Sequence, residues 1–241
     1  MEHHIESYLD THTRLVKERL SKYFHEKTPQ SIVSENLHYH LTNARSASFQ
    51  DYYFKTLGDR KQFLSQDGFF KIFARKYSLH VSDLGLVELE QNKPAILELI
   101  DANQLSELYF RYFTEFPQKR KKIIFTSEQG SFFTKLVHTF KPDEYCALDN
   151  PVKQLLGLGH DGFYIAFLVI SQAYREWSLE NQETLQQIRR QLEQMDANSK
   201  LPVQRMTDLK LLDLILWYEA HLLRQTSPGY IANEKSEQTS P

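Results

Sequence analysis

Asp161-Gly-Phe-Tyr-Ile-Ala-Phe-Leu-Val-Ile-Ser-Gln-Ala-Tyr-Arg-Glu-Trp177 contains the longest apolar run of the chain. The run predicts a buried helix that begins at Asp161-Gly162 and ends near Trp177. Its uninterrupted apolar part, Phe163 to Ile170, is far shorter than the ~20 residues that a membrane span needs. The segment therefore belongs to the core of a protein, and we expect no membrane partner.

Helical spacing continues on both sides of this segment. Residues 181–195 carry Leu185, Ile188, Leu192 and Met195 on one face, and Thr207 or Asp208 can cap a last helix that carries Leu211, Leu212, Ile215, Leu216 and Leu222. Residues 2–26 and 131–140 show the same period. Ile123-Ile124-Phe125 is the ambiguous piece, because it fits either a strand or the start of a helix.

Composition agrees with a helical fold. The 241 residues include only eight glycines and eight prolines, whereas 41% are hydrophobic and 13% are aromatic. Hairpin-rich folds need many more turn residues, and this share of aromatic rings can fill a sizeable core. We predict an all-α assembly of about ten to thirteen helices in two lobes, at residues 1–117 and 118–226, with a disordered tail at 227–241. The boundary rests on Pro117 and a change in charge.

Charge and cysteine content limit the kind of site. The formal net charge of -2 argues against a protein that binds nucleic acid over its whole surface, although it permits a local basic face. Cys146 is the only cysteine, so a disulfide within the chain, a Cys-rich zinc site and a four-cysteine iron–sulfur cluster are ruled out. A polar, acidic N-terminus does not resemble a signal peptide. We expect a cytoplasmic protein without a metal or other cofactor.

Basic residues and glycines concentrate in one stretch. Lys119-Arg120-Lys121-Lys122 is a run of four cations, and four of the eight glycines fall between Gly130 and Gly162. Such a run can contact phosphates, or it can be a solvated loop. Lys135 and Lys153 follow and can share a face with the run if the segment folds compactly. Any site is therefore expected in residues 117–162.

Residues 130–157 read Gly-Ser-Phe-Phe-Thr-Lys-Leu-Val-His-Thr-Phe-Lys-Pro-Asp-Glu-Tyr-Cys-Ala-Leu-Asp-Asn-Pro-Val-Lys-Gln-Leu-Leu-Gly. A helix after a glycine, a turn with proline and an aspartate at the start of the next helix resemble the core of the helix-hairpin-helix DNA glycosylases. Leu148-Asp149-Asn150-Pro151-Val152-Lys153 is most similar to the adenine glycosylases. Residues 211–217 resemble the last helix of distant relatives. The resemblance covers about 30 residues, from 126 to 157, with a weaker echo to 217.

The resemblance implies a function in DNA repair or in defence against foreign DNA. The aspartate at position 149 would stabilise positive charge on the sugar while the base leaves, after the nucleotide has flipped out of double-stranded DNA. Main-chain N–H groups of the hairpin would hold the DNA backbone. The residues expected to bind DNA are then Lys119, Arg120, Lys121, Lys122, Gly130, Ser131, Lys135 and Lys153.

The chain also departs from that family. The hairpin normally reads Leu-Pro-Gly-x-Gly, but Thr126-Ser-Glu-Gln-Gly130 keeps only the last glycine, and Glu128 has the wrong sign for a phosphate. Members with lyase activity carry a lysine about 18 residues before the aspartate, where this chain has Ser131 or Phe132. Lys135 is one helical turn too far along. We therefore expect hydrolysis without lyase chemistry, if the chain is an enzyme.

Three other interpretations remain open at this point. Asp149 can be an ordinary helix N-cap with no catalytic role. The aromatic helices expected at 48–78 and 104–116 can form an exposed docking surface of a non-enzymatic regulatory subunit or interaction protein. His138 or His160 can act as the base of a small enzyme. Histidines at 3, 4, 38 and 40 lack the spacing of metal ligands.

Overall fold

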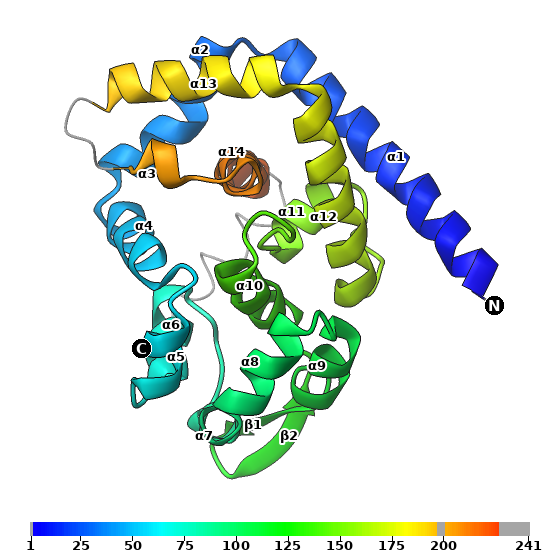
Figure 1. Cartoon of the computed structure of the whole chain (residues 1–241), viewed down its shortest axis with the longest axis vertical. Helices are drawn as coiled ribbons and strands as arrows, with labels where there is room; N and C mark the ends of the chain where they lie inside the picture. Colours follow the sequence, from blue (N-terminus) through cyan, green and yellow to red (C-terminus); the bar gives the residue numbers. More distant parts are fainter. Residues whose placement is uncertain (1, 197–200, 227–241) are drawn as a thin grey trace.

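Helices make up most of the chain that the computed structural model describes, which is residues 2–196 and 201–226. The predicted all-α fold is confirmed (Figure 1). The predicted tail at 227–241 lies outside the described residues. The first half contains α1 (Glu2–Glu26), α2 (Pro29–Ser31), η1 (Ile32–Leu37), α3 (His38–Thr42), α4 (Ala44–Thr56), α5 (Arg60–Ser65), α6 (Phe69–Lys76), α7 (Asp83–Gln91), α8 (Lys93–Asp101) and α9 (Leu105–Tyr112).

A two-stranded hairpin separates these helices from the second group. It consists of β1 (Phe116–Arg120) and β2 (Ile123–Ser127). After it come α10 (Gly130–Phe140), α11 (Asn150–Leu155), α12 (Phe163–Glu180), α13 (Gln182–Met195), η2 (Val203–Arg205) and α14 (Asp208–Thr226). The ambiguous segment at 123–125 is therefore a strand, and the helix expected at 104–116 already ends at Tyr112.

Helix α14 is seen nearly end-on in Figure 1, enclosed by α3, α11, α12 and α13. Leu211, Leu212, Ile215 and Leu216 on this helix are at most 2% exposed, so they anchor it in the apolar core. The helix packs against η1, α11 and α12. Its N-terminus is held by Thr207, whose Oγ1 accepts a hydrogen bond from the backbone N–H of Lys210 at 3.1 Å. Thr207, one of the two caps expected from the sequence, thus fixes the start of this helix.

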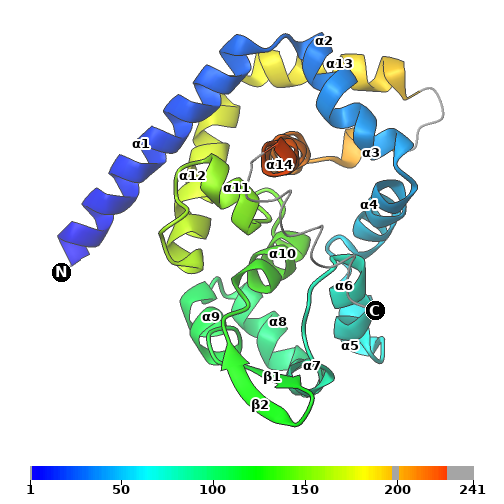
Figure 2. The ribbon, with the colours of Figure 1, turned by 180° about the vertical axis from the view of Figure 1, so that it is seen from behind.

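Helices from the two ends of the chain share one core. Helix α1 runs beside α12 (Figures 1 and 2), and the rings of Phe24 and Trp177 stack with their centroids 4.4 Å apart. The boundary expected at residue 117 falls inside β1, and buried residues on both sides of it belong to one continuous cluster. The site is consequently built by segments that are distant in the sequence.

Aromatic side chains of α4, α5, α6 and α9 point mainly into this core. Phe63, Phe70 and Phe73 are fully buried, and Phe73 stacks on Phe132 of α10 at 5.5 Å. Phe110, which is 64% exposed, is the large aromatic residue of these helices that faces outward most. These helices therefore support the core, and the exposed aromatic surface expected at 48–78 and 104–116 is not formed.

Candidate functional site

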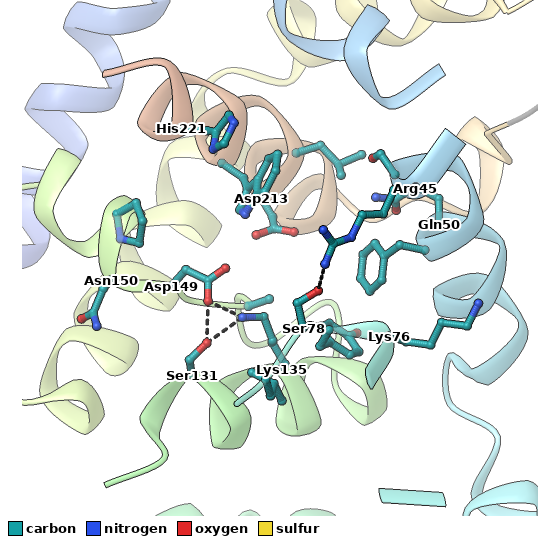
Figure 3. A pocket seen from close by; sticks show the side chains of 18 of the residues that line it. Arg45, Gln50, Lys76, Ser78, Ser131, Lys135, Asp149, Asn150, Asp213 and His221 are labelled. Carbon is teal, nitrogen blue, oxygen red and sulfur yellow. Dashed lines mark hydrogen bonds and ion pairs between the residues drawn. The ribbon is translucent and has the colours of Figure 1, made fainter. Parts of the chain in front are cut away.

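A pocket with a volume of about 690 Å³ opens beside Asp149 (Figure 3). Its walls come from α3, α4, α10, α14 and the segments that follow α6 and precede α11. Five of the residues that line it carry Phe, Tyr or Trp rings, namely Tyr39, Phe49, Tyr77, Phe163 and Trp217. The volume lies in the range of ordinary ligand sites, and the apolar walls with a few charged groups have the usual composition of such sites.

Asp149 occupies the N-cap position of α11, but its carboxylate caps no backbone group. A capping side chain would accept a hydrogen bond from the second or third helical N–H, and Pro151 has no N–H to offer. The Asp149 Oδ1 atom instead accepts hydrogen bonds from Lys135 Nζ and Ser131 Oγ (Figure 3). The ordinary N-cap explanation therefore does not account for this carboxylate.

The position of Asp149 is fixed by the residue before it. Leu148 is buried, and both of its backbone polar groups bond to the Thr134 side chain of α10, its N–H at 3.0 Å and its carbonyl at 3.1 Å. Two residues earlier, the Cys146 N–H donates to Ser171 Oγ of α12 at 3.0 Å. These bonds hold the segment along α10, so the carboxylate faces Ser131 and Lys135 on the same helix.

Lys135 contacts Asp149, although it lies one helical turn beyond Ser131 on α10. Helical side chains lean back over the preceding turn, and the long lysine chain reaches the level of Ser131. Its Nζ donates to Ser131 Oγ at 2.6 Å and pairs with Asp149 Oδ1. Only 9% of the Lys135 side chain and 25% of the Asp149 side chain are exposed, so the ion pair is largely shielded from water.

The charge of Asp149 is stabilised by its partners. Burial by itself would raise the pKa of this carboxyl group, but the positive charge of Lys135 acts in the opposite direction. Hydrogen bonds from Lys135, Ser131 and Trp217 lower the pKa further, and the net result is a pKa below the ordinary value. At neutral pH the pocket therefore contains a carboxylate anion.

One face of α14 forms the wall opposite Asp149. Pocket-lining residues recur on this helix at spacings of three and four, at Lys210, Asp213, Trp217, His221 and Arg224. The rings of Trp217 and His221 stack with centroids 5.3 Å apart. From the sequence we predicted only the apolar face of this helix, so these residues were missed. Polar groups at regular helical spacing within an otherwise apolar helix were the signal that could have identified them.

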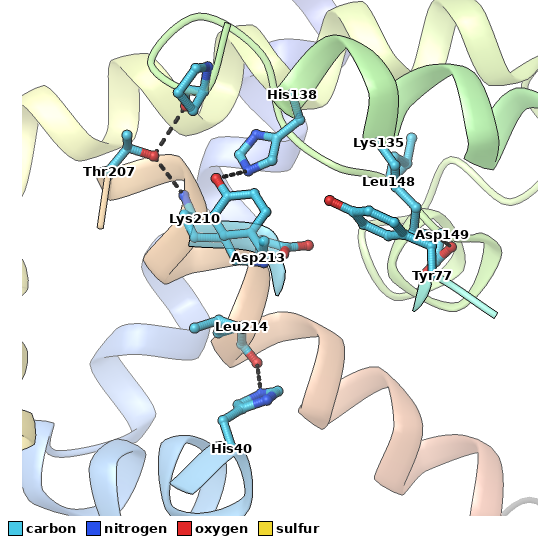
Figure 4. A network of polar contacts seen from close by, with 12 residues as sticks. His40, Tyr77, Lys135, His138, Leu148, Asp149, Thr207, Lys210, Asp213 and Leu214 are labelled. Carbon is cyan, nitrogen blue, oxygen red and sulfur yellow. Dashed lines mark hydrogen bonds and ion pairs between the residues drawn. The ribbon is translucent and has the colours of Figure 1, made fainter. Parts of the chain in front are cut away.

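A second lysine–aspartate pair lies on α14. Lys210 Nζ bonds to Asp213 at 2.8 Å and lies 4.5 Å from the centre of the Tyr53 ring (Figure 4). Both residues line the pocket, although Lys210 is only 2% exposed and its Nζ lies over the rings of Phe49 and Tyr53. Asp213 thus adds a second carboxylate to the pocket, and the ion pair as a whole adds no net charge.

His138 lies behind this pair and is completely buried. Its Nδ1 donates to the Tyr145 carbonyl at 2.6 Å, and its Nε2 accepts from the Tyr53 hydroxyl at 2.9 Å. Burial lowers its pKa to about 4, and the charge of Lys210 acts in the same direction. The neutral ring has both nitrogens occupied and does not line the pocket, so it is unsuited to act as a catalytic base. The other candidate, His160, is exposed and also lies outside the pocket lining.

The remaining residues expected to bind DNA fall in three places. Gly130 and Ser131 line the pocket, and a Cβ atom at Gly130 would lie 2.1 Å from Phe163 Cγ, so the glycine permits the close packing of α10 on α12. Lys153 is buried, with its Nζ donating to the Asp161 carbonyl and lying 5.0 Å from the centre of the Phe163 ring. The run from Lys119 to Lys122 is exposed on the hairpin, away from the pocket lining.

Glu128, which follows β2, lines the pocket and accepts a hydrogen bond from the Tyr109 hydroxyl. In the described part of the chain, no group of three or more His, Cys, Asp or Glu side chains is placed to hold a metal ion. Within residues 2–196 and 201–226, we also find no helix with the length and hydropathy of a membrane span.

No protein-family model, curated protein or solved structure matches this chain. The interpretation of the site therefore depends on the pocket itself. Its distinctive features are a carboxylate at a helix start that caps no backbone group, a lysine that pairs with it, and aromatic rings around both.

Proposed function

We propose that this protein binds double-stranded DNA and acts as a hydrolytic DNA N-glycosylase on damaged, modified or foreign bases. The observation that carries the proposal is the Asp149 carboxylate, which lines a pocket, caps no helix and is kept ionised by Lys135. A partly exposed carboxylate anion that lines a pocket is suited to stabilise positive charge that develops on a bound ligand.

The pocket has the size and lining for a nucleotide that has left a duplex. Its volume of about 690 Å³ leaves room for a base and its sugar, and the aromatic side chains of Trp217 and Tyr77 line it. Enzymes that act on a base in duplex DNA rotate it out of the stack into such a pocket. Arg45 and Lys76 also line the pocket and supply positive charge for a phosphate.

The proposed reaction breaks the bond between C1′ of the sugar and the base nitrogen. The bonding electrons leave with the base, and positive charge develops at C1′ opposite Asp149. Water then adds to C1′ and its proton is lost to solvent or to the departing base. Asp149 contributes electrostatically and remains unmodified, while Lys135 and Ser131 hold its Oδ1 in place.

Hydrolysis is proposed in preference to lyase chemistry because of how Lys135 is held. An amine must be free and neutral to attack C1′, whereas Lys135 Nζ donates to both Asp149 and Ser131. Sodium borohydride added during turnover should therefore trap no covalent protein–DNA complex. A trapped complex that disappears in Lys135→Gln would replace hydrolysis with a lysine-linked reaction.

The test of the proposal is base release from a panel of duplexes with damaged and modified bases. We expect Asp149→Asn to bind the duplexes as the wild type does and to release bases at least 100-fold more slowly, because an amide cannot supply the negative charge. Asp101→Asn is the matched control, since Asp101 pairs with Arg60 on the surface and does not line the pocket. Absence of base release by the wild type from the whole panel would refute the enzymatic proposal.

A further inference from the structure

The outer half of the β1–β2 hairpin presents apolar side chains to solvent. Ile123 is 69% exposed, Ile124 is 66% exposed and Phe125 is 44% exposed. By contrast, Phe116 at the base of the hairpin is 1% exposed and belongs to the core. A run of three consecutive exposed apolar residues is unfavourable in water and indicates a surface that contacts a partner.

Cations surround these apolar residues on both faces of the hairpin. In the strand register, Arg120 pairs with Ile123 and Lys119 pairs with Ile124. Neighbouring pairs point to opposite faces, so each face carries one cation beside one isoleucine. Lys121 and Lys122 form the turn between the strands, and Lys121 has a left-handed backbone with φ of 58°. No ion pair of these four cations is seen among the described residues.

We propose that this hairpin lies in a groove of the duplex, beside the nucleotide that enters the pocket. The inference rests on the proposed function and names the surface that holds the DNA. The four cations contact phosphates, while Ile123, Ile124 and Phe125 contact the bases and separate one base step. The major groove is wide enough to admit a two-stranded ribbon, and apolar wedges of this type open base steps in bent DNA.

The hairpin is joined directly to the pocket. Strand β2 ends at Ser127, and Glu128 and Gln129, the next two residues, line the pocket. The five residues of β2 span about 17 Å at ~3.3 Å per residue, a reach of about five base-pair steps at ~3.4 Å each. The hairpin can thus contact DNA within half a helical turn of the extruded nucleotide.

The order of charges along the hairpin favours DNA over an anionic membrane. A hairpin that enters a lipid surface would carry apolar residues at its tip and cations behind them. Here Lys121 and Lys122 are at the tip, and the isoleucines follow along the strand. Cations and apolar side chains side by side along the length of a ribbon suit the phosphates and bases of a groove.

The charge contribution is tested by salt dependence. We replace Lys119, Arg120, Lys121 and Lys122 together with alanine. The negative slope of log affinity against log salt should become shallower by about 3–4, because each phosphate contact contributes about 0.9. The matched control removes four exposed cations from α1, α5 and α13 with the same change in net charge, as Arg14→Ala, Lys22→Ala, Lys61→Ala and Arg190→Ala. An equal loss of slope in both variants would overturn the inference.

The apolar contribution is tested with Ile123→Ser combined with Ile124→Ser. We expect about tenfold weaker binding with an unchanged salt slope, and loss of the fluorescence increase of 2-aminopurine placed next to the target base, because stacking is no longer broken. Leu179→Ser combined with Val87→Ser is the control, since these residues are 75% and 54% exposed on other helices. Wild-type affinity and fluorescence in the hairpin variant would contradict the inference.

The outcomes separate this inference from the proposed function. If the hairpin variants lose DNA binding and the wild type releases no base, the hairpin is the DNA-binding surface and the glycosylase proposal is refuted. If the wild type releases bases and the hairpin variants bind DNA as the wild type does, the glycosylase proposal stands and the hairpin is not the DNA-binding surface. Binding to vesicles of phosphatidylserine and phosphatidylcholine, with no binding to any duplex, would assign the hairpin to a lipid surface and overturn the inference.

Discussion

The two lysine–aspartate pairs at the pocket are alike in chemistry and different in construction. Lys210 and Asp213 are three residues apart on one helix, so the pair forms wherever α14 forms. Lys135 and Asp149 come from different elements, and they meet only because Thr134 fixes the segment before Asp149. The first pair is local, whereas the second depends on the tertiary fold.

The burial of the pairs differs in the same sense. The Lys210 and Asp213 side chains are 3% and 13% exposed, compared with 9% and 25% for Lys135 and Asp149. The Tyr53 ring covers Lys210, and His138 bonds to that tyrosine. We infer that the Lys210–Asp213 pair mainly stabilises the pocket wall, whereas the Lys135–Asp149 pair is the one that the proposed reaction requires. Substitutions should then affect stability at the first pair and activity at the second.

The largest effect on stability is expected from Lys210→Met. The change leaves Asp213 with an uncompensated charge in a largely buried position, and it should lower the free energy of unfolding by about 3–5 kcal/mol. Urea denaturation followed by circular dichroism measures this loss. The double variant Lys210→Met with Asp213→Leu should recover a large part of it, because no unpaired charge remains. A single variant within about 1 kcal/mol of the wild type would contradict the structural role.

An intermediate effect is expected from pH. The pKa of His138 is lowered to about 4 and that of His40 to about 4, in both cases mainly by burial, whereas an unfolded histidine titrates near its ordinary value of 6.5. Between these values the unfolded chain binds more protons, so stability is present at neutral pH and decreases as the pH falls. Each ring should contribute a loss of roughly 2 kcal/mol between pH 7 and pH 5.

Urea unfolding at several pH values checks this expectation, with His138→Gln as the variant. The glutamine cannot be protonated, so the loss of unfolding free energy between pH 7 and pH 5 should be smaller by the contribution of one histidine, roughly 2 kcal/mol. His12→Gln is a control at a partly exposed position on α1. An unchanged pH slope in His138→Gln would exclude this ring as the cause.

The smallest effect is expected from Asp149→Asn on stability at acidic pH. Because the pKa of Asp149 is lowered in the folded protein, its charged form stabilises the fold above the ordinary value of 3.8 and loses this contribution as the pH falls through the folded pKa. The difference in unfolding free energy between wild type and variant should therefore narrow below about pH 4. A difference that widens in acid would show that the carboxylate is destabilising in the fold.

The helices were predictable because their apolar residues repeat at helical spacing. The helix expected at residues 2–26 matches α1, and the one expected at 181–195 differs from α13 by one residue. The strand at Ile123-Ile124-Phe125 and the strand that pairs with it were not predictable, because pairing depends on residues across the turn and not on the segment itself. The apolar residues of β2 are also exposed, so no alternation of burial marks it.

The site was predictable only in part. Asp149 was found from a local pattern, and the structure places it in a pocket. Its contact with Lys135 was missed because counting along the chain ignores the length and direction of a lysine side chain. Asp213 and Trp217 were missed because they are more than 60 residues further along and become neighbours of Asp149 only through the packing of α14 against α11.

Cys146 has a practical consequence for following these events in solution. It is the only thiol of the chain, it is completely buried, and burial raises its pKa to about 12. It should therefore not react with maleimide reagents in the folded protein. A dye can be attached selectively at Lys122→Cys on the hairpin without removing the native cysteine, so one fluorophore would report when the hairpin meets its partner.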